Sequence, residues 1–340
     1  MNTPIQGRDR PTEMVAIEIT QPGGPEVLSP TTRPIPSPKA NEVLIRVEAA
    51  GVNGPDILQR KGLYNPPPGA SDIPGLEIAG EVVAVGASVI DHAVGDRVAA
   101  LLTGGGYAQY AVADERVTIS IPDGLSMIEA AALPETFMTV WLNLFQRGQF
   151  KAGESVLIHG GASGIGTTAT MLARQLGAST IITTVASKAH QEASLRLGAD
   201  VAVNYLEDDF VAAVKAATDG AGVDVILDII GGDYVARNYE AAAMNGRILQ
   251  VSVLKGPAKE LNLWPMLAKR LTHSGSTLRS RTYEDKQGIL SELKRNVWPL
   301  IAEGRVKPEV YSTFPLANAA DAHRLIDSAE HIGKVVLVNR

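Results

Sequence analysis

A glycine-rich segment in the middle of the chain has the composition of a phosphate-binding loop. The apolar run Ser155–His159 leads into Gly160-Gly161-Ala162-Ser163-Gly164-Ile165-Gly166, and residues at helical spacing follow. Between a strand and a helix, such glycines let the backbone approach a pyrophosphate, whose charge the helix N-terminus stabilises. The pattern departs from G-x-G-x-x-G, because Ser163 replaces the second glycine and Gly164 stands beside it. We predict a dinucleotide site with cofactor contacts at Gly161, Ser163, Gly164, Ile165 and Gly166; the alternative is a tight turn without a ligand.

The residues after the next predicted strand favour NADPH over NADH. Folds that bind NAD place an acidic residue there for the ribose hydroxyls. This chain instead has Thr184-Val185-Ala186-Ser187-Lys188, without a carboxylate. Ser187 and Lys188 are suited to a ribose 2′-phosphate, and Tyr205, at the end of the third strand, is placed to close over it. The alternative for Lys188 is an exposed lysine in the first turn of a helix.

Composition narrows the class of protein. The chain has 340 residues, a formal net charge of −6 and no cysteine. The length suggests two domains, and the missing thiols exclude disulfides, thiolate zinc sites and iron–sulfur ligation. An acidic balance without a Lys/Arg cluster argues against a nucleic-acid partner. No membrane span is predicted, and residues 1–13 lack the apolar core of a secretory signal, so we expect a cytoplasmic protein.

The elements that position these residues fall into two groups. Short β-like segments punctuated by Gly and Pro fill roughly the first 130 residues, whereas strands and helices alternate further on, which is typical of a doubly wound parallel sheet. The tail returns to helix, strand, helix and strand, and we expect it to pack on the first domain. We therefore predict an α/β protein. Residues 134–279 form a Rossmann nucleotide-binding domain, residues 14–133 with 280–340 a β-rich domain, and residues 1–13 an extension.

Six segments form a specific set of family motifs. They are Gln21-Pro22-Gly23-Gly24-Pro25-Glu26-Val27-Leu28, Gly51-Val52-Asn53-Gly54-Pro55-Asp56, Gln59-Arg60-Lys61-Gly62-Leu63-Tyr64, Ile73-Pro74-Gly75-Leu76-Glu77-Ile78-Ala79-Gly80, Gly95-Asp96-Arg97-Val98 and the glycine-rich loop with the histidine before it. Together they resemble the zinc-free quinone oxidoreductases, the zeta-crystallin-like branch of the medium-chain dehydrogenase/reductase superfamily. The resemblance covers nearly the whole chain from Met14 and implies that the β-rich domain is a GroES-like catalytic domain.

Zinc-dependent members of the superfamily differ from this chain at their ligand positions. They place a Cys within the segment that is 53–56 here, a His at the position of Leu76, and four further Cys in a structural zinc lobe. This chain has no Cys, and its six His show no paired spacing. We therefore predict no metal site. The resemblance implies hydride transfer to an acceptor that needs no Lewis acid, such as a quinone or an activated alkene, rather than alcohol oxidation.

The resemblance also implies roles for individual residues. Asn53 and Asp56 would line the nicotinamide side of the cleft, although Gly54 and Pro55 replace the Arg-Ala that usually separates them. Tyr64 would face the substrate as a possible proton donor; the alternative is a surface aromatic in a proline-rich loop. The positions that match cofactor contacts are Thr139, Val251, Ser252 and Lys334, and for Thr139 the alternative is a buried helical threonine. The segment Arg279-Ser280-Arg281 either closes the pocket or is a polar strand end.

These inferences converge on an NADPH-dependent quinone oxidoreductase that transfers a hydride, or single electrons, without a metal. Two alternatives stay open: an NADPH-dependent enone or enoyl reductase, and a non-catalytic NADPH-binding crystallin-like protein. The family resemblance also implies a homodimer or homotetramer. We expect its interface at residues 271–278, on the edge of the nucleotide-binding sheet, because edge strands need protection.

Overall fold

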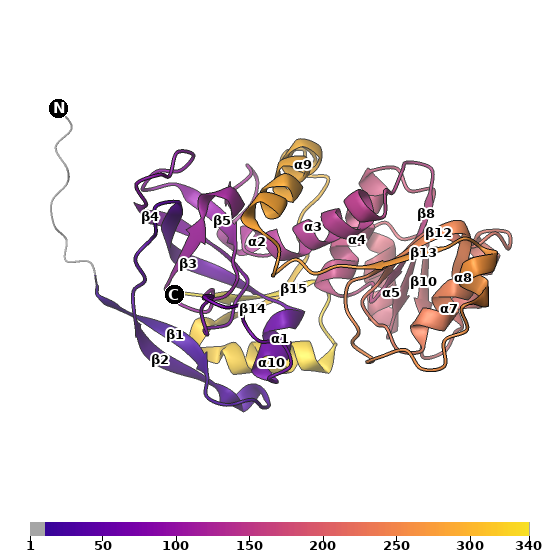
Figure 1. The fold of residues 1–340 in the computed structure, drawn as a ribbon, viewed down its shortest axis with the longest axis horizontal. Coiled ribbons are helices and arrows are strands. Elements are labelled where there is room, and N and C mark those ends of the chain that lie inside the picture. The colour runs from indigo at the N-terminus through magenta and orange to yellow at the C-terminus, as the bar shows by residue number, and fades with distance from the viewer. Residues whose placement is uncertain (1–10, 340) are drawn as a thin grey trace.

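The computed structural model describes residues 11–339, which form two lobes side by side (Figure 1). One lobe combines the N-terminal segment with the C-terminal tail, and the middle of the chain forms the other. Most of the predicted extension, residues 1–10, lies outside the described part of the chain. Its last residue, Glu13, already belongs to the first strand.

The first lobe is built mainly on antiparallel strands, although its last two strands pair in parallel. Its main sheet has the order β14-β15-β3-β4-β5-β7, with β6 beside β3, and β1 and β2 form a separate antiparallel pair. The bounds are β1 Glu13–Ile19, β2 Leu28–Pro34, β3 Glu42–Val52, β4 Glu77–Val85, β5 Arg97–Leu101, β6 Tyr110–Asp114, β7 Thr118–Ser120, β14 Val310–Pro315 and β15 Lys334–Val338. The apolar Val43, Ile45 and Val47 of β3 are buried whereas Arg46 is exposed, as alternation predicts.

The C-terminal tail completes this sheet. β15 runs antiparallel to β3, with Val335 opposite Val52 and Leu337 opposite Ala50. Three α-helices and three 3₁₀ turns accompany the strands: α1 Gly54–Arg60, α2 Met127–Ala130, α10 Ala319–Ser328, η1 Pro25–Val27, η2 Glu115–Val117 and η4 Leu316–Asn318. The domain boundaries at 133/134 and 279/280 stay a prediction.

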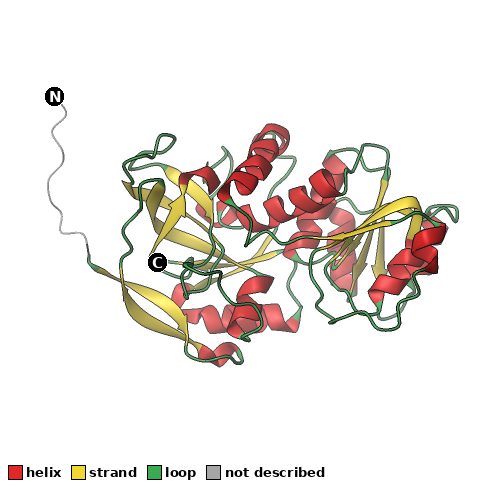
Figure 2. Cartoon of the chain, viewed as in Figure 1, coloured by secondary structure: helices red, strands yellow, loops and turns green. Residues whose placement is uncertain are grey.

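The second lobe is a parallel sheet with helices on its faces (Figure 2). Its strands have the order β10-β9-β8-β11-β12-β13, and they confirm the predicted doubly wound class. The bounds are β8 Ser155–His159, β9 Thr180–Val185, β10 Val201–Asn204, β11 Val223–Asp228, β12 Ala242–Gln250, β13 Thr272–Gly275, α4 Gly164–Gln175, α5 Lys188–Arg196, α6 Phe210–Ala217, α7 Tyr234–Ala241 and α8 Trp264–Ala268. Every residue of β8 is buried, which explains its continuous apolar run.

Two helices pack where the lobes meet. They are α3, Pro134–Val140, which continues as the π-helical turn Trp141–Arg147, and α9, Tyr283–Ala302. Composition predicts a single helix over residues 137–146. It does not predict the π-helical turn, because residue types do not distinguish a π-turn from an α-turn. Turns of this kind are frequent at functional sites. Phe137 belongs to one hydrophobic cluster with Ile119 of the first lobe and Ile158 of the second. Within residues 11–339, no helix is long and apolar enough to cross a membrane.

Candidate cofactor and hydride-transfer site

The glycine-rich loop has the geometry of an anion site. β8 ends at His159 and α4 begins at Gly164, so the loop lies at the carboxyl end of a central parallel strand. Ser163 caps α4, because its Oγ accepts a hydrogen bond from the Gly166 N–H at 3.0 Å. Its hydroxyl hydrogen stays available to a ligand. The N–H groups of Gly164 and Ile165, in the first turn of α4, have no partner within the helix. The loop therefore offers several donors to a diphosphate.

Close packing explains why this loop needs glycine. A Cβ on Gly166 would lie 2.2 Å from the carbonyl oxygen of Gly160, and one on Gly161 would lie 2.7 Å from Cβ of Thr183. On Gly164 it would meet Cδ of Lys334 at 2.7 Å. The glycines at 161 and 166 therefore let the loop and α4 pack against the sheet, and Gly164 admits the stem of a lysine from the other lobe.

The residues predicted to hold a 2′-phosphate gather at two neighbouring strand ends. Ser187 follows β9 and caps α5, its Oγ accepting from the His190 N–H at 3.2 Å. Lys188 is the first residue of α5 and is exposed. Tyr205 follows β10, is 39% exposed, and donates its backbone N–H to the Val185 carbonyl at 3.0 Å. A cation, a hydroxyl and an aromatic ring therefore share one edge of the sheet.

A surface hollow of about 420 Å³ lies at the ends of β12 and β13. Its lining includes Val251, Ser252 and Ser276. Thr139, on α3, is buried and connects to this hollow through Asn143, whose Nδ2 donates to the Thr139 carbonyl and whose Oδ1 accepts from Ser276 Oγ at 2.7 Å. The sequence-predicted contacts at 139, 251 and 252 thus lie around one region of the sheet edge.

The two lobes are joined by a backbone hydrogen bond at the glycine-rich loop. The N–H of Gly333 donates to the carbonyl of Ala162 at 2.7 Å, and Ser163 forms an isolated parallel bridge with Gly333. Gly333 has φ of +80°, and a Cβ there would lie 2.2 Å from the Glu309 carbonyl oxygen. Only glycine fits this crossing point.

Lys334 is buried immediately after this bond. Its side chain is 4% exposed, and Nζ lies 2.7 Å from Glu77 Oε1, 2.5 Å from Asn53 Oδ1 and 3.0 Å from the Val52 carbonyl. All three acceptors belong to the first lobe. The stem of Lys334 therefore touches the glycine-rich loop, while its ammonium group faces the carboxylate of Glu77. Its role as a cofactor contact stays a prediction.

Asn53 and Asp56 belong to the same buried polar cluster. Asn53 precedes α1, and its Nδ2 donates to Glu77 Oε1 at 3.0 Å. Asp56 is fully buried and accepts from the N–H groups of Asn53 at 2.9 Å and Gly75 at 3.0 Å. Burial raises the pKa of Asp56 to about 6, although the two backbone donors act in the opposite direction. Asp56 thus fixes the turn that presents Asn53.

Glu135 is a buried acid that the sequence pattern does not single out. It lies in the first turn of α3, and its backbone N–H donates to Glu77 Oε2 at 2.8 Å. Its own Oε2 is buried and has no hydrogen-bond partner among the described residues. Burial raises the pKa of Glu135 to about 8, and the neighbouring Glu77 adds to the effect. An acidic residue in a first helical turn is common, so its sequence position gives no signal of this protonation.

Tyr64 is half-buried and lies beside an arginine. The guanidinium carbon of Arg279 is 5.4 Å from the centre of the Tyr64 ring. Arg279 is itself buried and donates to the Thr103 carbonyl at 2.7 Å and to Gln59 Oε1 at 2.9 Å. Burial raises the pKa of Tyr64, while the Arg279 charge opposes that effect. The structure therefore groups Arg279 with the predicted substrate-facing residue.

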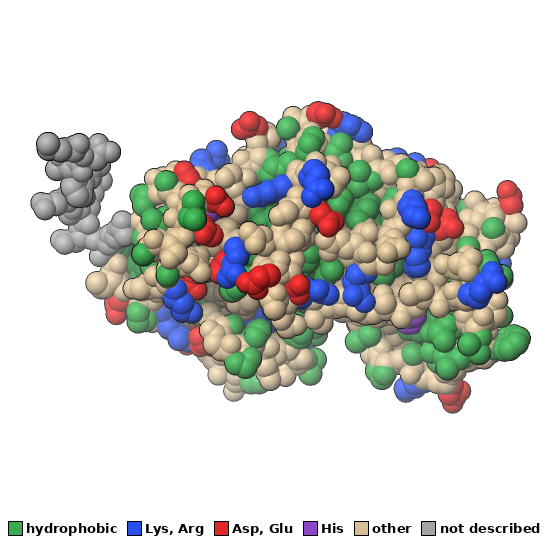
Figure 3. All heavy atoms as spheres, turned by 45° about the horizontal axis from the view of Figure 1, so that its top comes forward, with side chains coloured by type: hydrophobic (Ala, Val, Ile, Leu, Met, Phe, Trp, Pro, Cys, Tyr) green, Lys and Arg blue, Asp and Glu red, His purple; other side chains and the backbone are tan. Residues whose placement is uncertain are grey.

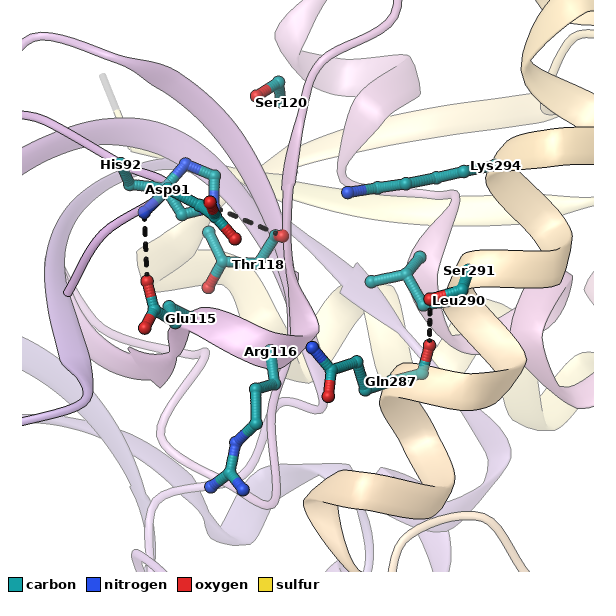
Figure 4. Close-up of a pocket in the computed structure, with 10 residues that line it drawn as sticks. All are labelled: Asp91, His92, Glu115, Arg116, Thr118, Ser120, Gln287, Leu290, Ser291 and Lys294. Carbon is teal, nitrogen blue, oxygen red and sulfur yellow. Dashed lines mark hydrogen bonds between the residues drawn. The ribbon is translucent and has the colours of Figure 1, made fainter. Parts of the chain in front are cut away.

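A cavity of about 280 Å³ lies elsewhere, between α9 and the first lobe (Figure 4). Lys294 and Gln287 of α9 face His92 and the Glu115–Val117 turn across it. No residue predicted for the cofactor or the substrate lines this cavity. Within residues 11–339, no group of three His, Asp or Glu side chains is arranged to hold a metal ion.

Comparison with known proteins agrees with this arrangement. Residues 39–123 match the family described as alcohol dehydrogenase GroES-like domain, and residues 197–337 match the family described as zinc-binding dehydrogenase. A quinone oxidoreductase of Rattus norvegicus is 33% identical over 96% of this chain and 98% of the rat protein.

Solved structures show the same likeness. The Escherichia coli quinone oxidoreductase complexed with NADPH superposes with a TM-score of 0.85 at 31% identity, covering 95% of this chain and 99% of that one. An NAD-dependent alcohol dehydrogenase superposes with a TM-score of 0.86 at 31% identity, covering 96% and 100%. With its relatives matched over nearly their whole length, the chain belongs to the quinone oxidoreductase branch of the medium-chain dehydrogenase/reductase superfamily.

Proposed function

We propose that this protein reduces quinones with NADPH. The observation that carries the proposal is the glycine-rich loop at the N-terminus of α4, with Ser187 and Lys188 at the neighbouring strand end. Relatives named quinone oxidoreductase that align over 96% of the chain support the choice of acceptor. The overall reaction takes a hydride from NADPH and a proton, and it yields NADP⁺ and a hydroquinone.

Each group of residues has a distinct task in this proposal. When bound, NADPH supplies the hydride. The first turn of α4 and Ser163 hold the diphosphate, and Ser187, Lys188 and Tyr205 hold the 2′-phosphate.

On the acceptor side, Asn53, fixed by Asp56, Glu77 and Lys334, lines the reacting side of the site. Tyr64 and Arg279 face a flat acceptor. Held between the two lobes, the reactants would be oriented and shielded from water.

An acceptor panel tests the function. We would follow NADPH oxidation with simple quinones, enones and crotonyl thioesters, before and after dialysis against a chelator. We expect quinones to give the highest kcat/KM and dialysis to leave it unchanged. Oxygen uptake during turnover would reveal semiquinone formation by one-electron transfer. Faster reduction of enones would favour the reductase alternative, and no oxidation with any acceptor would favour a binding protein.

Lys188 provides a test of cofactor choice. Because its exposed ammonium group would pair with the 2′-phosphate, we expect Lys188→Ala to raise KM for NADPH about tenfold, a loss of about 1.4 kcal/mol. KM for NADH and kcat should change little. Lys215→Ala, at an exposed lysine of α6, is the matched control and should leave both constants unchanged. Equal kcat/KM for NADPH and NADH in the unmodified protein would contradict the proposal.

We further propose a homo-oligomer formed through the β13 edge of the parallel sheet. β13 is the terminal strand of that sheet. Apolar side chains gather at the α8 end of the same lobe (Figure 3). In the segment from the end of β12 through α8, Val253, Leu254, Trp264 and Leu267 are more than half exposed. A second copy would pair with the open edge and cover these side chains.

Light scattering after size exclusion tests this interface. We expect a dimer or tetramer at micromolar concentration, and Trp264→Glu should shift it to a smaller species because a charge would be buried. Ile90→Glu, at an 87% exposed position of the first lobe, is the control. A monomeric unmodified protein would refute the oligomer. The cytoplasmic location stays a prediction, which cell fractionation would test.

A further inference from the structure

A series of hydrogen bonds connects Arg60, at the end of α1, to Asp56 in the first turn of the same helix through His323 of α10 and Tyr107. The Arg60 guanidinium lies 3.3 Å from His323 Nδ1, His323 Nε2 lies 3.0 Å from the Tyr107 hydroxyl, and that hydroxyl lies 3.3 Å from Asp56 Oδ2. Arg60 also pairs with Asp327 at 2.7 Å. The side chains of Arg60, Tyr107, His323 and Asp56 are all fully buried.

The donor and acceptor chemistry of the side chains fixes the direction of these hydrogen bonds. Arginine can only donate, so His323 accepts at Nδ1 and, as a neutral ring, carries its hydrogen on Nε2. That N–H donates to the Tyr107 oxygen, which leaves the Tyr107 hydrogen for Asp56. Burial lowers the pKa of His323 to about 3, and Arg60 acts in the same direction, so the ring is neutral near pH 7. Burial likewise keeps the pKa of Tyr107 well above its usual value.

The Tyr107 hydroxyl is thereby an oriented donor to a carboxylate. A donor of this kind stabilises the ionised carboxylate more than the neutral acid. Other ionisable groups lie around Asp56 and Tyr107. They are Lys334 of β15, Glu77 of β4, Glu135 of α3, Arg279 before α9, and Arg60 of α1.

We propose that Tyr107 and His323 are positioning residues, which act through Asp56 to hold the Asn53 turn in its reactive form. The ionised carboxylate accepts at the same time from Asn53, Gly75 and Tyr107, and so ties the start of α1 to the segment that leads into Glu77. A protonated Asp56 would accept these hydrogen bonds more weakly. Neither Tyr107 nor His323 needs to touch a reactant. This inference rests on the proposed function for its activity readout, and it extends that function to a pH dependence.

The first test is the pH profile of kcat/KM for a quinone between pH 5.5 and 9. In the unmodified protein, kcat/KM should fall as Asp56 becomes protonated, near pH 6. Tyr107→Phe removes the O–H donor, so we expect the acidic limb to move up by about one pH unit, with activity within about threefold of the unmodified protein at pH 8.5. His323→Leu should move the limb in the same direction, and His323→Gln, which can both accept and donate, should restore it.

Two further variants distinguish a positioning role of Tyr107 and His323 from a general loss of structure. Tyr110→Phe, at a half-buried tyrosine of β6, should leave the limb in place. The double variant Tyr107→Phe/His323→Leu should shift it no further than Tyr107→Phe alone, because both changes act through one hydrogen bond. A loss of activity by the same factor at every pH, or an unmoved limb in Tyr107→Phe, would overturn the proposal.

A stability measurement tests the proposal without an activity assay. Asp56 binds its proton more tightly in the folded protein than in the unfolded chain, so its ionisation lowers stability as pH rises between about 4 and 6. Without the Tyr107 donor, ionisation of Asp56 should lower stability further. The Tm of Tyr107→Phe should therefore lie further below that of the unmodified protein at pH 8 than at pH 5. Asp56→Asn should abolish this pH dependence. A constant Tm deficit would overturn the proposal even if no quinone is reduced.

Discussion

Replacing Lys334 with methionine should lower the free energy of unfolding by about 3–5 kcal/mol, as expected when one partner of a buried ion pair is removed. Lys334 is 4% exposed and Glu77 is fully buried, so the Glu77 carboxylate would keep its desolvation cost and lose its cation. Methionine keeps the apolar stem that packs at Gly164. Urea unfolding at pH 7, read by circular dichroism, measures the loss.

Two controls make this prediction specific. Lys307→Met breaks the surface pair with Glu129, in which the lysine is 58% exposed, and should cost less than about 1 kcal/mol. The double variant Glu77→Gln/Lys334→Met should be more stable than Lys334→Met alone, because no unpaired charge stays buried. If Lys307→Met and Lys334→Met lowered the free energy of unfolding equally, burial of the Lys334–Glu77 ion pair would contribute nothing beyond a surface pair.

Glu135→Gln should stabilise the protein at alkaline pH and leave it nearly unchanged at pH 5. The folded-state pKa of about 8 lies above the ordinary value of 4.5, so the folded protein retains a proton that the unfolded chain releases. Stability therefore falls as pH rises from about 4.5, and the fall ends above about pH 8. Glutamine resembles the neutral acid and cannot ionise, so the stability of the variant does not show this fall with rising pH.

The expected difference in unfolding free energy between the variant and the unmodified protein follows from the interval between the two pKa values. At about 1.4 kcal/mol per pH unit, it corresponds to on the order of 3–5 kcal/mol at pH 9. Urea unfolding of both proteins at pH 5, 7 and 9 would show the difference growing with pH. Glu207→Gln, at an exposed position, should give no such growth. A difference independent of pH would mean that Glu135 ionises as an ordinary glutamate.

Local patterns in the sequence predict the fold well, because each depends on neighbouring residues. The glycine-rich loop lies between a buried strand and a helix whose start is fixed by Ser163, and both signals are short-range. The alternation of strands and helices likewise predicts the parallel sheet. The π-turn at Trp141–Arg147 escapes prediction because it depends on hydrogen-bond spacing and not on residue type.

The candidate site is harder to predict because its contacts join distant parts of the chain. Tyr107 and His323 are 216 positions apart, and Lys334 and Asn53 are 281 apart. The resemblance assigns Lys334 to the cofactor, but it gives no indication that the ammonium group lies on Glu77. The neutral state expected of Glu135 arises from burial beside another carboxylate, which no spacing rule encodes. Family motifs identify such residues, whereas their protonation follows only from the packed structure.

The backbone bond between Ala162 and Gly333 has a mechanical consequence. Because it fastens the lobes beside the glycine-rich loop, any rocking motion of one lobe against the other would have its fulcrum near this bond. Atoms at the fulcrum barely travel, while remote surfaces swing through longer arcs. The diphosphate cradle would then stay assembled as the outer mouth widens. In the proposed function, an acceptor would then enter and its product depart while the dinucleotide stays bound.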